Sequence, residues 1–364
     1  MKDTVTSGPD LAPLKLVLEN GNEIQLSTSE VGALHEEDFD SIPILDLSDL
    51  NSPSLSQRTA LANELKSAAS TVGFFYIKNH QIPLDIVDGA FEMSKRFFAL
   101  SEDEKMKIWT GFFPEGQYTG YHPMGRYNRA GNKFNDLYEA FNMSYDPQFD
   151  PLPPPEEKAK GCYNNIWPEL IPEMKQTMMK YQNEWLTLGR KILDLTAISL
   201  GLPEDYFQGA CEAPSGGLRI IHYPIQEHAV SEQNGIGPHT DFQTLTFVNP
   251  GEVSGLQVIN KRGQWIEVPP LKNHLIVNVA DCLQRITNDE LVSTVHRVVN
   301  NKAGRDRFSI AYFFGFDNDY LLKPIPGAVT DERPQKYKDI VTSKDYYAWR
   351  AKMAKSGQNL KLKP

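Results

Sequence analysis

The chain has 364 residues and a formal net charge of −10 at pH 7, and 40% of its residues are hydrophobic. This composition is that of an ordinary globular protein. The acidic surplus argues against a nucleic-acid or anionic-membrane partner, because there is no surplus of basic residues to bind phosphates. The sparse cysteines, Cys162, Cys211 and Cys282, argue against a disulfide framework and fit the reducing cytoplasm. We find neither a signal-peptide pattern nor an apolar run near the length of a membrane span of about 18 residues.

The first half of the chain combines helical patterns with short apolar runs. Residues 14–26 predict a hairpin that turns at Asn20-Gly21 and belongs to an N-terminal extension. Between residues 110 and 155 the periodicity is lost and Gly, Pro, Tyr and Asn are frequent, which is typical of a long functional segment. Apolar residues at helical spacing predict helices over 54–72, 83–100 and 171–202, and β-rich runs predict strands within 42–50 and 73–80.

From residue 217 onward the pattern changes to short strands separated by turn residues. The runs are GLRIIHYP, TLTFVN, GLQVIN, QWIEV, HLIVNVA, STVHRVVN and RFSIAYFF. Several short strands at regular spacing predict a sandwich or barrel. In RFSIAYFF both faces carry residues that need cover, so helices are expected outside the sheet. We therefore predict a mainly β protein with flanking helices, in which a double-sheet jelly roll follows a helical N-terminal part.

The motif that organises this region is HTD at residues 239–241, followed by a lone His296. If the segment is extended, His239 and Asp241 fall on the same face. Two imidazoles and one carboxylate on one side of a metal form the facial triad of non-haem Fe(II) oxygenases. The alternative is a loop histidine before an aspartate in a turn, because GIGPHTD is rich in turn residues. The order of HTD, His296 and the later RFS motif favours the metal site.

A second constellation is the RFS motif at 307–309. Arg307 and Ser309 share one face of a strand. A guanidinium fork beside a hydroxyl is suited to anchoring a carboxylate. The two motifs together therefore predict a metal site with an anion anchor nearby.

These motifs resemble the isopenicillin N synthase-like branch of the Fe(II)/2-oxoglutarate-dependent dioxygenases, over roughly residues 40–320. The similar segments are IPILDL, GFFYIKNHQIP with Gln81 in place of a Gly, FFALSEDEKMK, NNIWP, GLQVINKRGQWIEVPP, VNVADCLQRITND, HRVVN and RFSIAYFF. The resemblance implies a distorted double-stranded β-helix, or jelly roll, with iron at its open end. Our division is then an extension (1–40), a helical N-terminal part (41–215), the Fe(II)/2-oxoglutarate dioxygenase jelly-roll core (216–320) and a C-terminal segment packing on the core (321–364).

The resemblance also implies roles for particular residues. The metal ligands and catalytic residues of the family fall on His239, Asp241 and His296, and its 2-oxoglutarate anchor falls on Arg307 and Ser309. The family's motif of Asn, Tyr and Pro, which helps to hold 2-oxoglutarate, falls on Ile221, Tyr223 and Pro224. Tyr223 is therefore an expected donor, whereas Ile221 replaces the usual Asn and leaves that wall more apolar.

The implied activity is oxidation of a small organic molecule by hydroxylation, desaturation or rearrangement, in secondary-metabolite biosynthesis. Fe(II), O2 and 2-oxoglutarate as co-substrate are expected, with release of succinate and CO2, and ascorbate is a candidate reductant. One alternative is an oxidase of the isopenicillin N synthase type, which does not use 2-oxoglutarate. Another is a catalytically silent binding protein, against which the intact triad argues. We expect a cytoplasmic monomer.

Candidate substrate contacts come from two regions. The aromatic segment 118–127 is expected to close over the iron. Phe242 follows the triad directly, and Phe313 shares a strand face with Arg307, so both are expected to form an apolar wall. The alternative is that the tyrosines only pack the segment onto the barrel. The candidates are Tyr118, Tyr121, Arg126, Phe141, Phe242 and Phe313.

Overall fold

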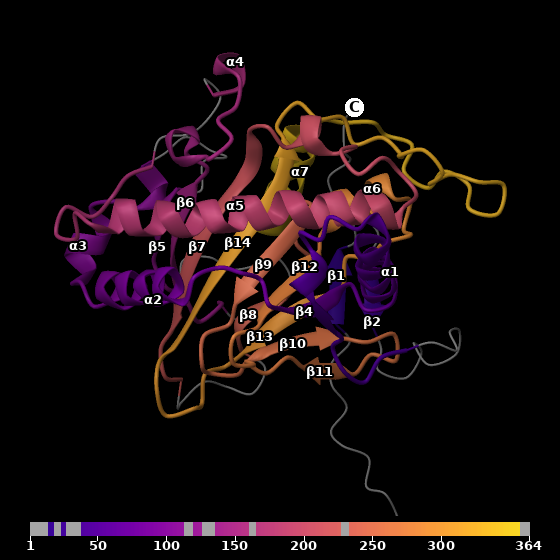
Figure 1. Cartoon of the computed structure of the whole chain (residues 1–364). Helices are drawn as coiled ribbons and strands as arrows, with labels where there is room; N and C mark the ends of the chain where they lie inside the picture. Colours follow the sequence, from indigo (N-terminus) through magenta and orange to yellow (C-terminus); the bar gives the residue numbers. More distant parts are fainter. Residues whose placement is uncertain are drawn as a thin grey trace, which may run out of the picture.

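Two facing sheets form the centre of the structure, a computed structural model that describes residues 14–17, 23–26, 38–112, 119–125, 135–159, 165–226 and 233–356. Within these residues the larger sheet has eight strands in the order β3-β4-β12-β9-β14-β7-β6-β5, and the smaller has four in the order β11-β10-β13-β8 (Figure 1). A separate hairpin pairs β1 (Leu14–Val17) with β2 (Glu23–Leu26).

The strands are short and follow the expected runs. Those of the larger sheet are β3 (Ile44–Asp46), β4 (Phe74–Lys78), β5 (Gly120–His122), β6 (Glu139–Ser144), β7 (Pro214–Tyr223), β9 (Leu245–Asn249), β12 (Leu275–Val279) and β14 (Arg307–Asp317). Those of the smaller sheet are β8 (Asn234–His239), β10 (Leu256–Ile259), β11 (Trp265–Glu267) and β13 (His296–Val299).

Strand β14 separates two apolar cores, because successive side chains of a strand point to opposite faces. Ile310, Tyr312 and Phe314 lie in the core between the larger sheet and the helices. Arg307 and Ser309 face the other way, toward the smaller sheet. The core between the two sheets is made by residues of both, including Phe74, Tyr76, Ile221, Tyr223, Ile276 of the larger sheet and Ile236, Leu256, Val258, Val298 of the smaller.

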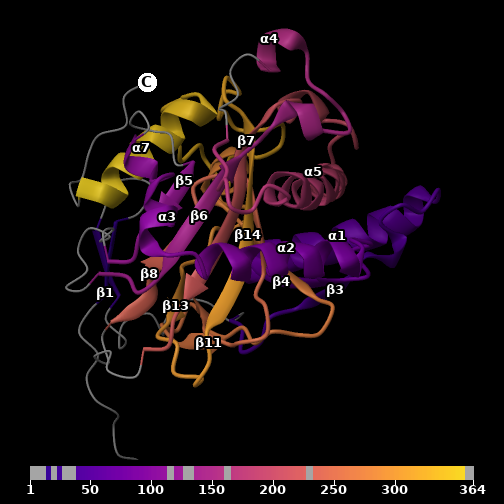
Figure 2. The ribbon, with the colours of Figure 1, turned by 90° about the vertical axis from the view of Figure 1, so that its left-hand side faces the viewer.

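Helices cover the outer face of the larger sheet. Figure 2 shows α1 (Leu55–Thr71), α2 (Leu84–Phe98) and α5 (Met174–Ser199) together on one side of β14, and α7 (Ser343–Ser356) at the opposite side of the view. The long helix α5 buries the apolar stripe expected from its sequence. Its Trp185 is fully buried, with its ring 5.5 Å from that of Phe247 on β9. The remaining helices are α3 (Glu102–Met106), α4 (Glu156–Ala159) and α6 (Asp281–Ile286).

The end of α1 is tied to the chain that leads into β13. The amides of Val72 and Gly73 both donate to the carbonyl of Ala68, and Gly73 has φ +71, which is the usual left-handed helix end. A Cβ atom at Gly73 would lie 2.2 Å from the carbonyl oxygen of Val292. The Thr294 hydroxyl donates to the Val72 carbonyl at 2.7 Å. Helix α1 thereby helps to position the start of β13.

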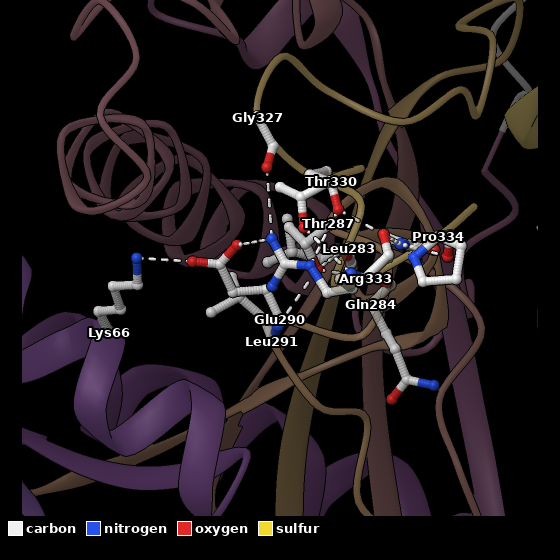
Figure 3. Close-up of polar contacts among 12 residues, drawn as sticks. Lys66, Leu283, Gln284, Thr287, Glu290, Leu291, Gly327, Thr330, Arg333 and Pro334 are labelled. Carbon is white, nitrogen blue, oxygen red and sulfur yellow. Dashed lines mark hydrogen bonds and ion pairs between the residues drawn. The ribbon is translucent and has the colours of Figure 1, made fainter. Parts of the chain in front are cut away.

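The C-terminal segment is anchored to the helices by an ionic cluster centred on Glu290 (Figure 3). Glu290 accepts from Lys66 of α1 at 2.6 Å and from Arg333 at 2.6 Å. Arg333 also donates to the carbonyl of Ala328 at 2.9 Å. Burial acts to raise the pKa of Glu290, but the two cations outweigh it and hold that pKa below its usual value. One carboxylate therefore joins three segments that are distant in the sequence.

The jelly roll, its flanking helices and the N-terminal hairpin are confirmed, although the turn at Asn20-Gly21 lies outside the described residues. Two segments differ from the expectation. Strand β8 forms over residues rich in turn formers, and its Pro238 is accommodated because β8 is an edge strand. Strands β5 and β6 form within the segment expected to be irregular, since β6 pairs along β7. Among the helices of the described residues, none is long and apolar enough to cross a membrane.

Replacing Gly73 by Ala tests the close approach at the end of α1. Gly201 is a matched control, because it has φ +74 with nothing within 4 Å of an added Cβ atom. Both substitutions carry the left-handed backbone cost of about 1–2 kcal/mol, and only Gly73→Ala adds a clash costing about 1–3 kcal/mol more. Urea unfolding should show that difference, and equal free energies of unfolding would contradict the packing.

Candidate metal centre

Two strands of the smaller sheet bring the histidines together. His239 ends β8 and His296 begins β13, and the two are direct partners in the antiparallel register. Their ring centroids are 4.2 Å apart. Asp241 follows β8 by two residues, with Oδ1 3.7 Å from His239 Nε2 and Oδ2 3.8 Å from His296 Nε2. Potential ligand atoms of all three residues lie within 4.8 Å of one another. The predicted triad is thus brought together in one place.

Backbone carbonyls orient both imidazoles. His239 Nδ1 lies 2.9 Å from the carbonyl oxygen of Gly237, and His296 Nδ1 lies 3.2 Å from that of Thr294. A carbonyl can only accept, so each Nδ1 must donate. In the neutral ring this leaves Nε2 as the unprotonated nitrogen, on the side toward Asp241. This arrangement is the one that metal-ligating histidines use.

The carboxylate of Asp241 is held from a neighbouring strand of the larger sheet. The amide of Asn278 donates to Asp241 Oδ2 at 2.9 Å, and the backbone amide of Asp281 donates to the Asp241 carbonyl at 3.0 Å. Phe74 packs edge-on against His296 with centroids 5.1 Å apart. Two imidazoles oriented through their Nδ1 atoms and one oriented carboxylate beside an aromatic wall are a donor set that fits Fe(II).

The C-terminal helix α7 clamps the residues on either side of Asp241. Arg350 Nη1 pairs with Asp281 Oδ2 at 3.0 Å, and Nη2 donates to the Thr240 hydroxyl at 2.9 Å. The guanidinium carbon lies 4.7 Å from the Phe242 ring centroid. Burial raises the pKa of the Asp281 carboxyl, and Arg350 opposes this effect. Nothing in the sequence pattern had pointed to Arg350, because no motif links α7 to the triad.

The Arg307, Ser309 and Tyr223 group lies between the sheets. Arg307 is directly opposite Tyr223 in the β14–β7 register. Its Nε donates to the Val253 carbonyl at 3.0 Å, and its guanidinium carbon lies 4.5 Å from the Tyr223 ring centroid. Burial raises the pKa of the Tyr223 phenol. Among the described residues the hydrogen-bond partners of the Arg307 guanidinium are the Val253 carbonyl and the Ser309 hydroxyl rather than a carboxylate, and Arg307 is only 2% exposed. A buried guanidinium in this situation is costly unless a ligand supplies the anion.

Two of the expected substrate contacts lie in the helix-side core instead. The Tyr121 hydroxyl donates to Glu139 at 2.6 Å, and Lys105 Nζ lies 5.2 Å over its ring. Phe141 is fully buried against Phe97, with centroids 4.7 Å apart. The expectation for Tyr121 and Phe141 is therefore wrong, because strand alternation turns both side chains away from the face that carries Arg307 and Ser309.

The other expected contacts have separate outcomes. Tyr118 and Arg126 lie outside the described residues. Phe242 is half-buried between Arg350 and Tyr347 of α7, with ring centroids 6.2 Å apart for the aromatic pair. Phe313 is half-buried on the β14 face that also carries Arg307.

A jelly roll that carries two histidines and one carboxylate on facing side chains is the architecture of a mononuclear non-haem iron enzyme. Two family models match the chain. The non-haem dioxygenase in morphine synthesis N-terminal model matches residues 42–170, and the 2OG-Fe(II) oxygenase superfamily model matches residues 215–316. The chain therefore belongs to the 2-oxoglutarate- and Fe(II)-dependent oxygenases, and its cofactors are Fe(II), 2-oxoglutarate and O2.

Individual relatives are similar over most of the chain. A 2-oxoglutarate-Fe(II) type oxidoreductase, ppzC, from Metarhizium rileyi is 33% identical over 92% of this chain and 93% of its own. Kihadalactone A synthase from Citrus sinensis is 32% identical over 84% of this chain and 91% of its own. The solved structure of a full-length Neurospora crassa protein in complex with alpha-KG and thymine has a TM-score of 0.74 and 27% identity, and covers 85% of this chain and 96% of that chain.

Removing the candidate ligand Asp241 should abolish iron-dependent turnover and greatly weaken Fe(II) binding. Asn278→Leu should weaken Fe(II) binding by about 10–100-fold, the usual effect of losing a group that orients a ligand. Anaerobic calorimetric titration measures the Fe(II) affinity of both variants. Asn260→Leu is the control, since Asn260 is also buried but bonds Phe39 and Gln264. Undiminished Fe(II) affinity in Asp241→Ala would contradict the site.

Proposed function

We propose that His239, Asp241 and His296 hold the Fe(II) and that Arg307, Ser309 and Tyr223 bind the distal carboxylate of 2-oxoglutarate. The observation that carries the proposal is the buried Arg307, which lacks a carboxylate partner in the described chain and shares the inter-sheet space with the triad. When bound, Fe(II), 2-oxoglutarate and O2 supply the oxidising chemistry, with release of succinate and CO2.

The protein residues position the reactants and exclude water. The fixed Nδ1 contacts of His239 and His296 orient both rings toward one point. Arg307 supplies charge and a fork, and the Ser309 hydroxyl lies 3.5 Å from Nη1 as a second polar group beside it. Ile221, opposite Ser309 in register and 5% exposed, makes the adjoining wall apolar. Such a dry wall strengthens the charge-assisted contact to a carboxylate.

The substrate we propose is a small organic molecule of secondary metabolism. This proposal draws on the name of the relative from Citrus sinensis, which is a synthase of a named natural product. Phe313 is the proposed apolar contact, and Tyr118 and Arg126 stay predictions. The names of the relatives favour 2-oxoglutarate over the oxidase alternative. We also propose that the enzyme is a cytoplasmic monomer.

Arg307→Gln should raise the dissociation constant of 2-oxoglutarate about 10–100-fold, because a charge-assisted hydrogen bond contributes about 1.5–3 kcal/mol. The dissociation constant of the Arg307→Lys variant should lie between those of the wild-type protein and Arg307→Gln, because lysine keeps the charge but lacks the two-pronged guanidinium. Calorimetry on the iron-loaded protein under nitrogen measures both. Arg305→Gln is the control, because Arg305 is an exposed neighbour that pairs with Glu252. Equal affinity in Arg307→Gln and Arg305→Gln would remove Arg307 from the site.

A screen of small organic substrates should give one succinate for each product formed. The same reactions without 2-oxoglutarate, but with iron, reductant and O2, should give no sustained product. Full-rate turnover in 2-oxoglutarate-free buffer would instead establish the oxidase alternative.

A further inference from the structure

Two neighbouring polar side chains on β6 and β7 each leave one buried atom without a partner. Asn142 and Arg219 are direct partners in the antiparallel register. Arg219 Nη2 donates to the Tyr138 hydroxyl at 3.0 Å, and Asn142 Nδ2 contacts His122 Nε2 at 3.0 Å. Among the described residues, Arg219 Nε and Asn142 Oδ1 are both buried and have no hydrogen-bond partner. Native proteins rarely leave such atoms unsatisfied without a reason.

Contacts along the inter-sheet face connect this pair to the proposed 2-oxoglutarate site. The Arg219 guanidinium carbon lies 5.1 Å from the Tyr138 ring centroid, and the Tyr138 ring lies 6.2 Å from that of Tyr223. Tyr223 in turn packs on Arg307. The unsatisfied pair therefore lies on the face that holds the co-substrate anchor.

The same face connects the pair to the proposed metal ligands. Arg219 is opposite Ala311 on β14, and Phe313 is two residues further on the same strand face. Phe313 is opposite Thr246 on β9, and Thr246 is opposite Asn278 on β12. Asn278 donates to Asp241. The pair and Asn278, which holds the proposed ligand Asp241, thus belong to adjacent rows of one surface, with the half-buried Phe313 between them.

We propose that Arg219 and Asn142 recognise a cis-amide edge of the substrate, as found in a lactam or a cyclic imide. Arg219 Nε–H calls for an acceptor, and Asn142 Oδ1 calls for a donor beside it. An adjacent carbonyl oxygen and N–H of a ring amide provide both groups on one side of the molecule. This inference rests on the proposed function, because it places the ring in the space between the two sheets, where the proposed iron and 2-oxoglutarate sites also lie.

Other common polar groups fit the pair less well. A carboxylate would satisfy Arg219 and would then bring a second anionic acceptor against Asn142 Oδ1. An ammonium group would satisfy Asn142 and would meet the like charge of Arg219. A site that hydrogen-bonds its ligand discriminates strongly against analogues that lack the matching group, because the buried atoms are then left unpaired.

The test is an anaerobic calorimetric titration of the full chain loaded with Fe(II) and 2-oxoglutarate. The probes are 2-pyrrolidone, N-methyl-2-pyrrolidone, which lacks the N–H, and butyrate, which is a carboxylate. We expect 2-pyrrolidone to bind at least about tenfold more tightly than either of the others, the effect of about 1.4 kcal/mol. The 2-oxoglutarate dissociation constant is measured in every sample.

Two variants and one control test whether Asn142 and Arg219 cause the preference for 2-pyrrolidone. Asn142→Leu should abolish the preference for 2-pyrrolidone over its N-methyl analogue, and Arg219→Met should weaken binding of both. Asn183→Leu is the control, because Asn183 lies on α5 and has its own buried, unpartnered Oδ1. It should leave all three affinities unchanged, and an unaltered 2-oxoglutarate affinity shows that each variant is folded.

The outcomes separate this inference from the proposed function. If the wild-type protein binds 2-oxoglutarate but binds N-methyl-2-pyrrolidone or butyrate as well as 2-pyrrolidone, or binds none of them, the cis-amide proposal is overturned and the oxygenase assignment stands. If iron-loaded protein fails to bind 2-oxoglutarate, the proposed co-substrate site itself fails.

Discussion

The structure depends on the antiparallel pairing of β8 with β13, which sets His239 opposite His296. A shift of one residue would turn one imidazole to the other face of the sheet. Asp241 completes the cluster only because β8 ends just before it and because Asn278 and the amide of Asp281 hold its two ends. The smaller sheet supplies the histidines, whereas Asn278 of the larger sheet orients the Asp241 carboxylate and α6 holds the Asp241 backbone carbonyl. The cluster therefore requires both sheets to pack in one arrangement.

The two faces of the larger sheet have different roles, one in stability and the other in ligand binding. The face toward the helices carries mainly apolar side chains such as Tyr312 and Phe314, which pack with Trp185 of α5, although the buried ion pair of Glu139 with Lys105 also lies on this side. The face toward the smaller sheet carries buried polar groups, namely Arg307, Ser309, Asn278 and the Arg219–Asn142 pair. Burying such groups costs free energy that the helix-side core has to offset. The apolar packing of the helices on one face can therefore offset the cost of burying polar side chains on the other.

Much of this arrangement could be predicted from the sequence, because strand alternation and motif spacing are local signals. The triad residues follow from the order of HTD, His296 and RFS, and the shared face of Arg307 and Ser309 follows from period-two alternation. Tyr121 and Phe141 were misplaced because β5 and β6 have weak local patterns, and their faces are set by pairing with β7. The polar Asn278 within the otherwise apolar strand β12 is a sequence signal for a functional side chain. Arg350 could not have been found, since only tertiary packing brings α7 to Thr240.

The account is tested most directly by an anaerobic crystal structure of the protein with Fe(II) and 2-oxoglutarate. It predicts one iron bound by His239, Asp241 and His296, with 2-oxoglutarate completing its coordination and extending its distal carboxylate to Arg307, Ser309 and Tyr223. An iron bound by other residues, or a 2-oxoglutarate whose distal carboxylate lies away from Arg307, would contradict it.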